Sequence, residues 1–181
     1  MTVRDMIVYD RVTEIISCFT GIDKVPPQIL KEAAHRGTVV HQMVEGYLKG
    51  IGHPEIPEAY QAYYNAFEPW IKDNPISVDW MERRFFCDDL MITGQMDIFT
   101  QDRRLIDIKT GSSMQKSWPV QLAGYKYLLE RNGIVPASFH ILWLNGKDCK
   151  YITYTIDDKY EDLFMSCYDI YNFFYSAKKK W

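Results

Sequence analysis

The sequence has 181 residues, of which 47% are hydrophobic and 15% aromatic, and this composition excludes a disordered chain. The length suits one domain, and we expect residues 1–181 to form it, with a helical N-terminal part, residues 1–75, packed on the core. The net charge of −3 excludes a globally basic surface, so binding of nucleic acid would require a local basic groove.

The lack of a recognisable targeting signal and the spacing of the cysteines indicate a protein of the cell interior. The longest apolar runs, such as Phe139 to Leu144, are too short to cross a bilayer, and the N-terminus lacks the pattern of a signal peptide. We therefore expect a cytoplasmic protein that does not contact membranes. The cysteines form no CxxC pair, which favours interior thiols over a zinc site; they are Cys18, Cys87, Cys149 and Cys167.

The first third of the chain has the periodicity of helices. A short apolar run covers Val12 to Phe19. A second helix is predicted from Pro26 to Ala34, because proline suits a first turn. Apolar side chains then recur every three or four positions from Arg36 to Lys49. Another helix is predicted from Pro57 to Asn74, and its stripe of aromatic side chains is typical of a core face.

The middle third changes to the period of strands. Val78 to Phe86, Met91 to Phe99 and Leu105 to Lys109 are three predicted strands joined by short polar turns. Strands connected in this way form an antiparallel meander.

The last third returns to alternating elements. A helix is predicted from Trp118 to Arg131, followed by strands from Phe139 to Leu144 and from Tyr151 to Ile156. A final helix is predicted from Asp158 to Ala177. The order of elements predicts an α/β fold in which helices flank a mixed central sheet.

Two carboxylates and one ammonium group are expected to share a patch of this sheet. Residues two apart on a strand point to the same face, so Asp107 and Lys109 project together, away from Ile106 and Ile108. Asp97, expected at the end of the neighbouring strand, can reach Asp107. Paired carboxylates suit Mg²⁺ or Mn²⁺, and such a cation with a lysine can hydrolyse a phosphodiester.

A surface ion pair is the alternative for Asp107 and Lys109, because a DxK tripeptide is common. Three features of the context favour the metal patch. Isoleucines flank Asp107, an upstream aspartate lies on the adjacent strand, and Gly111 closes the third strand.

The set of motifs resembles the PD-(D/E)xK nuclease superfamily, in its RecB-like and phage-type exonuclease branch. Asp97 with Asp107-Ile108-Lys109 is similar to the signature itself. Arg36 to His41 resembles the "RGT-x-x-H" helix of that branch, and Gln121 to Tyr125 resembles its "Q-x-x-x-Y" helix. Glu82 matches an upstream glutamate. The resemblance runs from about Val12 to Leu129, in the expected order.

The resemblance implies a restriction-endonuclease-like core that binds Mg²⁺, for which Mn²⁺ can substitute. The implied metal ligands are His41, Asp97, Asp107 and the backbone carbonyl of Ile108. Asp97, Asp107 and Lys109 would be catalytic, with Lys109 managing the attacking water. Four further residues are implied around the metal or the DNA: Glu82, Gln121, Tyr125 and, less directly, Glu45.

The residues alone leave several of these roles open. His41 and Glu45 are four apart and share one helix face, but a core histidine and a solvated glutamate explain them as well. Gln121 and Tyr125 also share a face, and an ordinary amphipathic helix would explain that pair.

We expect an exonuclease that acts on DNA ends, in phage or prophage recombination or in repair. A structure-selective endonuclease, a non-catalytic DNA-binding or assembly module and a nuclease acting on RNA are the alternatives. The partners that follow are DNA, a recombinase or single-strand annealing protein, and further copies of the chain. No iron–sulfur cluster is expected, because the C-terminal region holds only Cys149 and Cys167.

Overall fold

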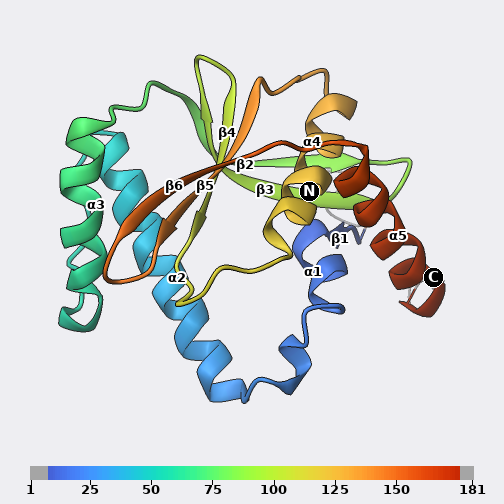
Figure 1. Cartoon of the computed structure of the whole chain (residues 1–181), viewed down its shortest axis with the longest axis horizontal. Helices are drawn as coiled ribbons and strands as arrows, with labels where there is room; N and C mark the ends of the chain where they lie inside the picture. The colour runs from blue at the N-terminus through green and yellow to red at the C-terminus, as the bar shows by residue number, and fades with distance from the viewer. Residues whose placement is uncertain (1–7, 176–181) are drawn as a thin grey trace.

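A six-stranded sheet forms the centre of the computed structural model, which describes residues 8–175. Within these residues the strand order is β1-β3-β4-β5-β6, and β2 lies on the other side of β3 (Figure 1). The strands are β1 (Asp10–Arg11), β2 (Val78–Cys87), β3 (Ile92–Thr100), β4 (Arg104–Lys109), β5 (Ser138–Leu144) and β6 (Cys149–Tyr154). β4 and β5 run parallel, whereas β2–β3, β3–β4 and β5–β6 are antiparallel, so the sheet is mixed as predicted.

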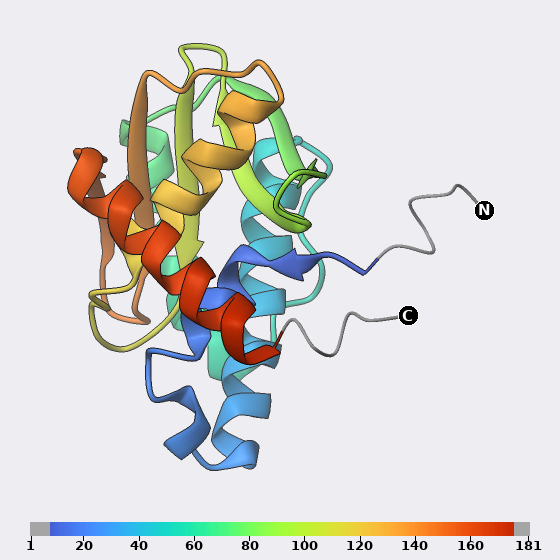
Figure 2. The same cartoon turned by 90° about the vertical axis from the view of Figure 1, so that its right-hand side faces the viewer.

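Helices cover both faces of the sheet. They are α1 (Val12–Ser17), α2 (Pro27–Leu48), α3 (Gln61–Asp73), α4 (Trp118–Arg131) and α5 (Asp158–Tyr175), with short 3₁₀ turns η2 (Ile22–Lys24) and η3 (Glu58–Tyr60). Figures 1 and 2 show α2 and α3 on one side of the sheet and α1, α4 and α5 on the other. The predicted α/β architecture, a mixed sheet flanked by helices, is confirmed.

Two hydrophobic cores result from this arrangement, one on each face. Ile106 and Ile108 of β4 pack in the core under α2 and α3. Leu105, on the opposite face of the same strand, packs with Leu122 of α4 and Phe164 of α5. β4 is therefore buried on both faces, which suits a strand in a parallel pair. The N-terminal helices contribute to both cores, and the division of the chain into domains stays a prediction.

The sheet forks between β3 and β4. These strands pair at only two positions, Ile98 with Ile106 and Phe99 with Leu105, and then diverge. Beyond the fork, β1 pairs with β3 on the side that β4 has left. Asp97 lies at the fork, in the interior of β3, so the expectation that it ends the strand was wrong. Its Oδ2 accepts a hydrogen bond of 2.6 Å from the Ile108 N–H, a donor that the departing strand leaves free.

The alternation of faces along β3 also changes at Asp97. Met96 packs in the core under α4, yet Ile98, two residues later, packs in the core under α2. Glu82 falls opposite Asp97 in the ladder with β2, and its φ of 50° is left-handed. Such a backbone costs roughly 1–3 kcal/mol for a residue with a side chain. Both carboxylates consequently lie near α2.

Some predicted elements differ from the observed ones. The helices predicted around Ala34 and Arg36 are one continuous helix, α2, because no breaker lies between them. β1 was not predicted. α4 has the predicted bounds, and the predicted end of the last helix, residues 176–177, lies outside the described residues. The expectation of interior thiols fails for Cys18, which is exposed. In residues 8–175, no helix has the length and apolar character needed to span a membrane.

Candidate active site

Three side chains from three elements meet beside the fork. His41 Nδ1 on α2 lies 3.5 Å from Asp97 Oδ1 and 3.6 Å from Glu82 Oε1. The ligand atoms of these three residues all lie within 4.8 Å of one another. The two carboxylate oxygens of Asp97 therefore have different partners: Oδ2 accepts a hydrogen bond from the backbone of β4, and Oδ1 faces His41.

A second group of side chains continues from β4 to α4. Lys109 Nζ lies 2.7 Å from Asp107 Oδ2 and donates a hydrogen bond of 2.9 Å to Gln121 Oε1. The Gln121 amide donates in turn to Asp107 Oδ1 and to the Tyr125 hydroxyl, both at 2.9 Å. Gln121 thus fixes the carboxylate and the ammonium relative to each other.

Asp107 and Lys109 are not an exposed surface ion pair. Asp107 is 3% exposed and Asp97 is 7% exposed, so neither carboxylate is hydrated as it would be on an open strand face. Burial of charge at this density costs free energy and persists where the charges serve a function or bind a cation.

Electrostatic coupling shifts the pKa values of the site. Burial lowers the pKa of His41, but the charge of Asp97 and contacts with Asp97 and Glu82 outweigh it and raise the pKa to about 10. Burial would raise the pKa of Asp97, yet His41 and the Ile108 N–H hold it below its usual value. Burial raises the pKa of Asp107 to about 6, although Lys109 acts in the opposite direction. The raised pKa favours a protonated His41 beside Asp97 and Glu82, while Lys109 is the cation beside Asp107.

The donor set fits a hard divalent cation. Glu82 Oε1 is buried and has no hydrogen-bond partner among the described residues. It borders a cavity of about 490 Å³ between α2 and the sheet, which His41 and Glu45 also line. Carboxylate oxygens with one imidazole nitrogen are ligands that Mg²⁺ and Mn²⁺ accept. The Ile108 carbonyl points to the same strand edge as its N–H, toward Asp97, because both groups of a strand residue face one neighbour.

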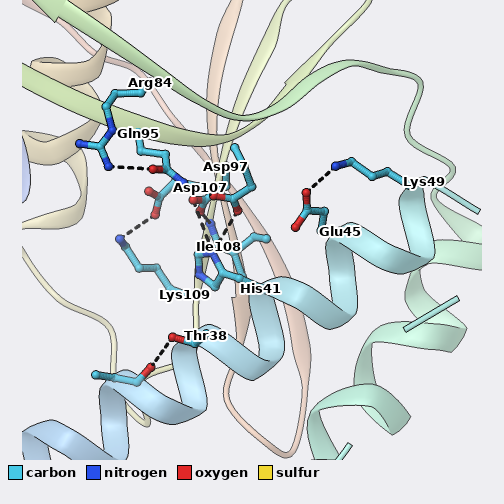
Figure 3. Close-up of polar contacts among 12 residues, drawn as sticks. Thr38, His41, Glu45, Lys49, Arg84, Gln95, Asp97, Asp107, Ile108 and Lys109 are labelled. Atoms are coloured by element: carbon cyan, nitrogen blue, oxygen red, sulfur yellow. Dashed lines mark hydrogen bonds and ion pairs between the residues drawn. The ribbon is translucent and has the colours of Figure 1, made fainter. Parts of the chain in front are cut away.

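The structure brings most of the predicted site residues together and adds two. Glu45 lines the cavity but pairs with Lys49, with Oε1 and Nζ 2.5 Å apart (Figure 3). Sequence reasoning missed Gln95, whose amide donates to Glu82 Oε2 at 2.6 Å. It also missed Arg84, which donates to Gln95 Oε1 at 2.8 Å. The signal was available, since Gln95 lies two residues before Asp97, but its partners depend on the strand register.

Gln95 lines the cavity between α2 and the sheet, and it also lines a second cavity. This smaller cavity, of about 200 Å³, is lined by two arginines, Arg11 and Arg84, together with Thr13, Gly94, Gln95 and Tyr125. Two guanidinium groups next to a cluster of carboxylates form a local basic surface on an acidic protein.

Comparison with known proteins rests on structure. No family profile and no curated protein matches the sequence. A protein from Eubacterium rectale, provisionally named an exonuclease, matches over 76% of this chain with a TM-score of 0.56 and 13% identity. The protein SSO0001 matches over 91% of this chain and 77% of its own, with a TM-score of 0.53 and 15% identity. This chain therefore shares its fold with these two proteins.

The likeness to these proteins is one of fold alone. The chain spans 64% of the length of the Eubacterium rectale protein. An alkaline exonuclease from Laribacter hongkongensis matches over 97% of this chain and 92% of its own, at 13% identity and a TM-score of 0.43, which is too low to weigh. The roles of individual residues rest on the geometry of this chain.

Proposed function

We propose that the protein is a Mg²⁺-dependent deoxyribonuclease that hydrolyses DNA from its ends. The observation that carries this proposal is the buried carboxylates Asp97 of β3 and Asp107 of β4, with Lys109 beside Asp107 and with His41, which lines the cavity, beside Asp97. Mn²⁺ would substitute for Mg²⁺, because both cations accept the same oxygen ligands.

The residues would divide the work as follows. His41, Asp97, Asp107 and the Ile108 carbonyl would hold the cation, with Glu82 as a further oxygen ligand, and His41 would release its proton on binding. When bound, the cation supplies Lewis-acid polarisation of the phosphoryl oxygen and lowers the pKa of a water. Lys109 orients the attacking water and stabilises the negative charge that develops on the phosphoryl oxygens.

The surrounding polar groups keep this arrangement in place. Gln121 bonds both Asp107 and Lys109, and Gln95 bonds Glu82, so the carboxylates and the ammonium are oriented before substrate binds. The Tyr125 hydroxyl accepts a hydrogen bond from Gln121 and is buried, which raises its pKa and keeps it neutral.

The small basic cavity favours action at ends over internal cleavage. Arg11 and Arg84 line a space of about 200 Å³, which suits a phosphate group. A terminal phosphate carries no further nucleotide and can enter such a cavity more fully than a phosphate within a strand. The proposed role in phage or prophage recombination or in repair follows from an activity on ends. A recombinase or single-strand annealing protein would then use the product.

The test compares linear with covalently closed circular DNA in Mg²⁺. We expect end-labelled linear DNA to be degraded and circular DNA to stay intact. Lys109→Ala should lower kcat by about 10²- to 10⁴-fold, the usual contribution of a positioned acid–base group. Cleavage of circular DNA would favour a structure-selective endonuclease on the same fold. Binding without cleavage of any linear, branched or RNA substrate would favour a non-catalytic module.

A further inference from the structure

The loop between β4 and α4, residues 110–117, begins directly after Lys109. Four of its polar side chains are exposed: Ser112, Ser113, Gln115 and Lys116. The first residue of the loop faces α2 close to the cavity, because Thr110 Oγ1 lies 3.9 Å from the place that a Cβ on Gly37, which lines the cavity, would occupy. None of the ion pairs among residues 8–175 involves Lys116.

One tryptophan fixes both ends of this loop. The Trp143 Nε1–H donates a hydrogen bond of 2.7 Å to the Gly111 carbonyl, at the start of the loop. The Trp143 ring also packs edge-to-face on Trp118, the residue after the loop, with ring centroids 5.6 Å apart. Trp143 lies opposite Lys109 in the ladder between β4 and β5, and only 8% of it is exposed.

The two contacts join the loop to the catalytic strand. A connection of this length would lose conformational entropy on binding a ligand, and fixing its two ends beforehand reduces that cost. Because Trp118 begins α4, the same ring also sets the start of the helix that carries Gln121. Trp143 holds the loop through the Gly111 carbonyl and the Trp118 ring, so its effect on a ligand would be indirect.

We propose that residues 110–117 form a loop that binds the phosphate backbone of the nucleic acid beside the scissile bond, and that Trp143 is the positioning residue that holds this loop in its binding shape. This rests on the proposed nuclease function. The Ser112 and Ser113 hydroxyls and the Lys116 ammonium are groups that contact phosphate without regard to base sequence. A contact between the loop and the phosphate backbone would place the nucleic-acid strand between the loop and α2.

The experiment measures binding and turnover separately in the full chain. Binding of a fluorescent single-stranded oligonucleotide is followed by anisotropy in EDTA, where no hydrolysis occurs, and kinetics are measured in Mg²⁺. We expect Trp143→Phe, which keeps a ring but loses the N–H, to raise Kd and KM about fivefold, as expected for one lost hydrogen bond. Its kcat should stay within about twofold, because Lys109 and Asp107 are untouched.

Lys116→Ala tests the loop without touching the core. It should weaken binding and make the slope of log K against log salt shallower by about 0.7, while Lys159→Ala, a matched change on α5, leaves both unchanged. The double variant Trp143→Phe with Lys116→Ala should lose less affinity than the product of the single losses, because Trp143 acts through the loop. Trp143→Tyr, which keeps a ring and a donor, should restore part of the affinity.

The outcomes separate this inference from the nuclease proposal. If the wild type cleaves DNA but neither Trp143→Phe nor Lys116→Ala changes Kd or KM, the loop does not bind the backbone. If Trp143→Phe lowers only Tm and kcat, Trp143 has a structural role and the positioning proposal is wrong. Should Trp143→Phe not fold, Trp143→Tyr and Lys116→Ala decide in its place. Failure of the wild type to cleave any DNA refutes the proposed function first.

Discussion

At the scale of a single residue, the two carboxylate oxygens of Asp97 have different roles. Oδ2 replaces a strand partner for the Ile108 N–H, while Oδ1 faces His41. An asparagine can keep an acceptor toward Ile108, but its neutral amide cannot offer the second oxygen to a cation. Substitution by asparagine should therefore preserve the fold and remove the metal site.

Asp97→Asn should abolish the rise in Tm that Mn²⁺ produces in the wild type. A ligand at 100 times its Kd stabilises the folded state by about 2.7 kcal/mol, which a thermal scan resolves readily. The matched control is Asp79→Asn, an exposed aspartate on β2, and it should keep the full response. An undiminished Mn²⁺ effect in Asp97→Asn would remove Asp97 from the metal ligands.

His140 is a buried histidine outside the site, and it should make stability depend on pH. It lies in β5, stacks on Tyr151 and exchanges hydrogen bonds with Ser138 and Thr153. Burial, with the charge of Arg104, lowers its pKa to about 4. Between about pH 6.5 and pH 4 the unfolded chain binds a proton that the folded chain does not. The free energy of unfolding therefore falls as the pH falls through this window.

His140→Gln should remove this part of the pH dependence. The depressed pKa corresponds to a loss of roughly 3 kcal/mol in the wild type across the window, because each pKa unit is worth about 1.4 kcal/mol. Urea unfolding at pH 7, 5.5 and 4.5 measures the effect. The difference in unfolding free energy between wild type and variant should shrink as the pH is lowered. A constant difference would show that His140 titrates normally.

At the scale of elements, the packing of α4 against β3 depends on a glycine. A Cβ on Gly94 would lie 2.9 Å from side-chain atoms of Leu128 and Tyr125. These are buried ring and methyl groups, so α4 or Tyr125 would have to move. Because Tyr125 bonds Gln121, the displacement would reach Asp107 and Lys109.

Gly94→Ala should accordingly reduce both stability and activity. We expect a loss of about 1–3 kcal/mol, the usual cost of overpacking a core, together with a lower kcat. Chemical denaturation and steady-state kinetics measure the two effects. Gly133→Ala, at the end of α4, is the comparison: there the left-handed φ of 75° costs stability, but a Cβ meets nothing within 4 Å and kcat should not change. Equal kcat in both variants would contradict the coupling.

Local sequence signals predicted the bounds of those elements that end at a helix-breaking or capping residue. α4 was predicted with its observed end because Asn132-Gly133 caps the helix. α2 was divided in two where no residue breaks a helix. β1 could not be predicted, since two residues show no periodicity and its pairing with β3 exists only because the sheet forks.

The same limit applies to the candidate site. The period of two placed Asp107 with Lys109, and a spacing of four placed Gln121 with Tyr125; both pairs are observed in contact through hydrogen bonds or an ion pair. Gln95 and Trp143 could not be assigned in this way. Their partners, Glu82 and the Gly111 carbonyl, lie on other strands or loops and are set by register.

For the whole molecule, the net charge of −3 limits how DNA can be held. Among residues 8–175, four cations near the site are candidates to contact phosphate, namely Arg11, Arg84, Lys109 and Lys116. Each phosphate contact adds about 0.7 to the salt slope for a single strand, so log K against log salt should have a slope of about −3.

Divalent cations should strengthen this binding, because they offset the repulsion between phosphate and the carboxylates of Asp97, Asp107 and Glu82. The Lys109→Ala variant allows the measurement in Mn²⁺ with hydrolysis suppressed, and anisotropy at several salt concentrations gives the slope. With both proteins in EDTA, the slope for Lys109→Ala should be shallower by about 0.7 than the slope for the wild type, since one cation is gone. A slope steeper than about −6 would require a broad basic face, and affinity that Mn²⁺ leaves unchanged would place the strand away from the carboxylates.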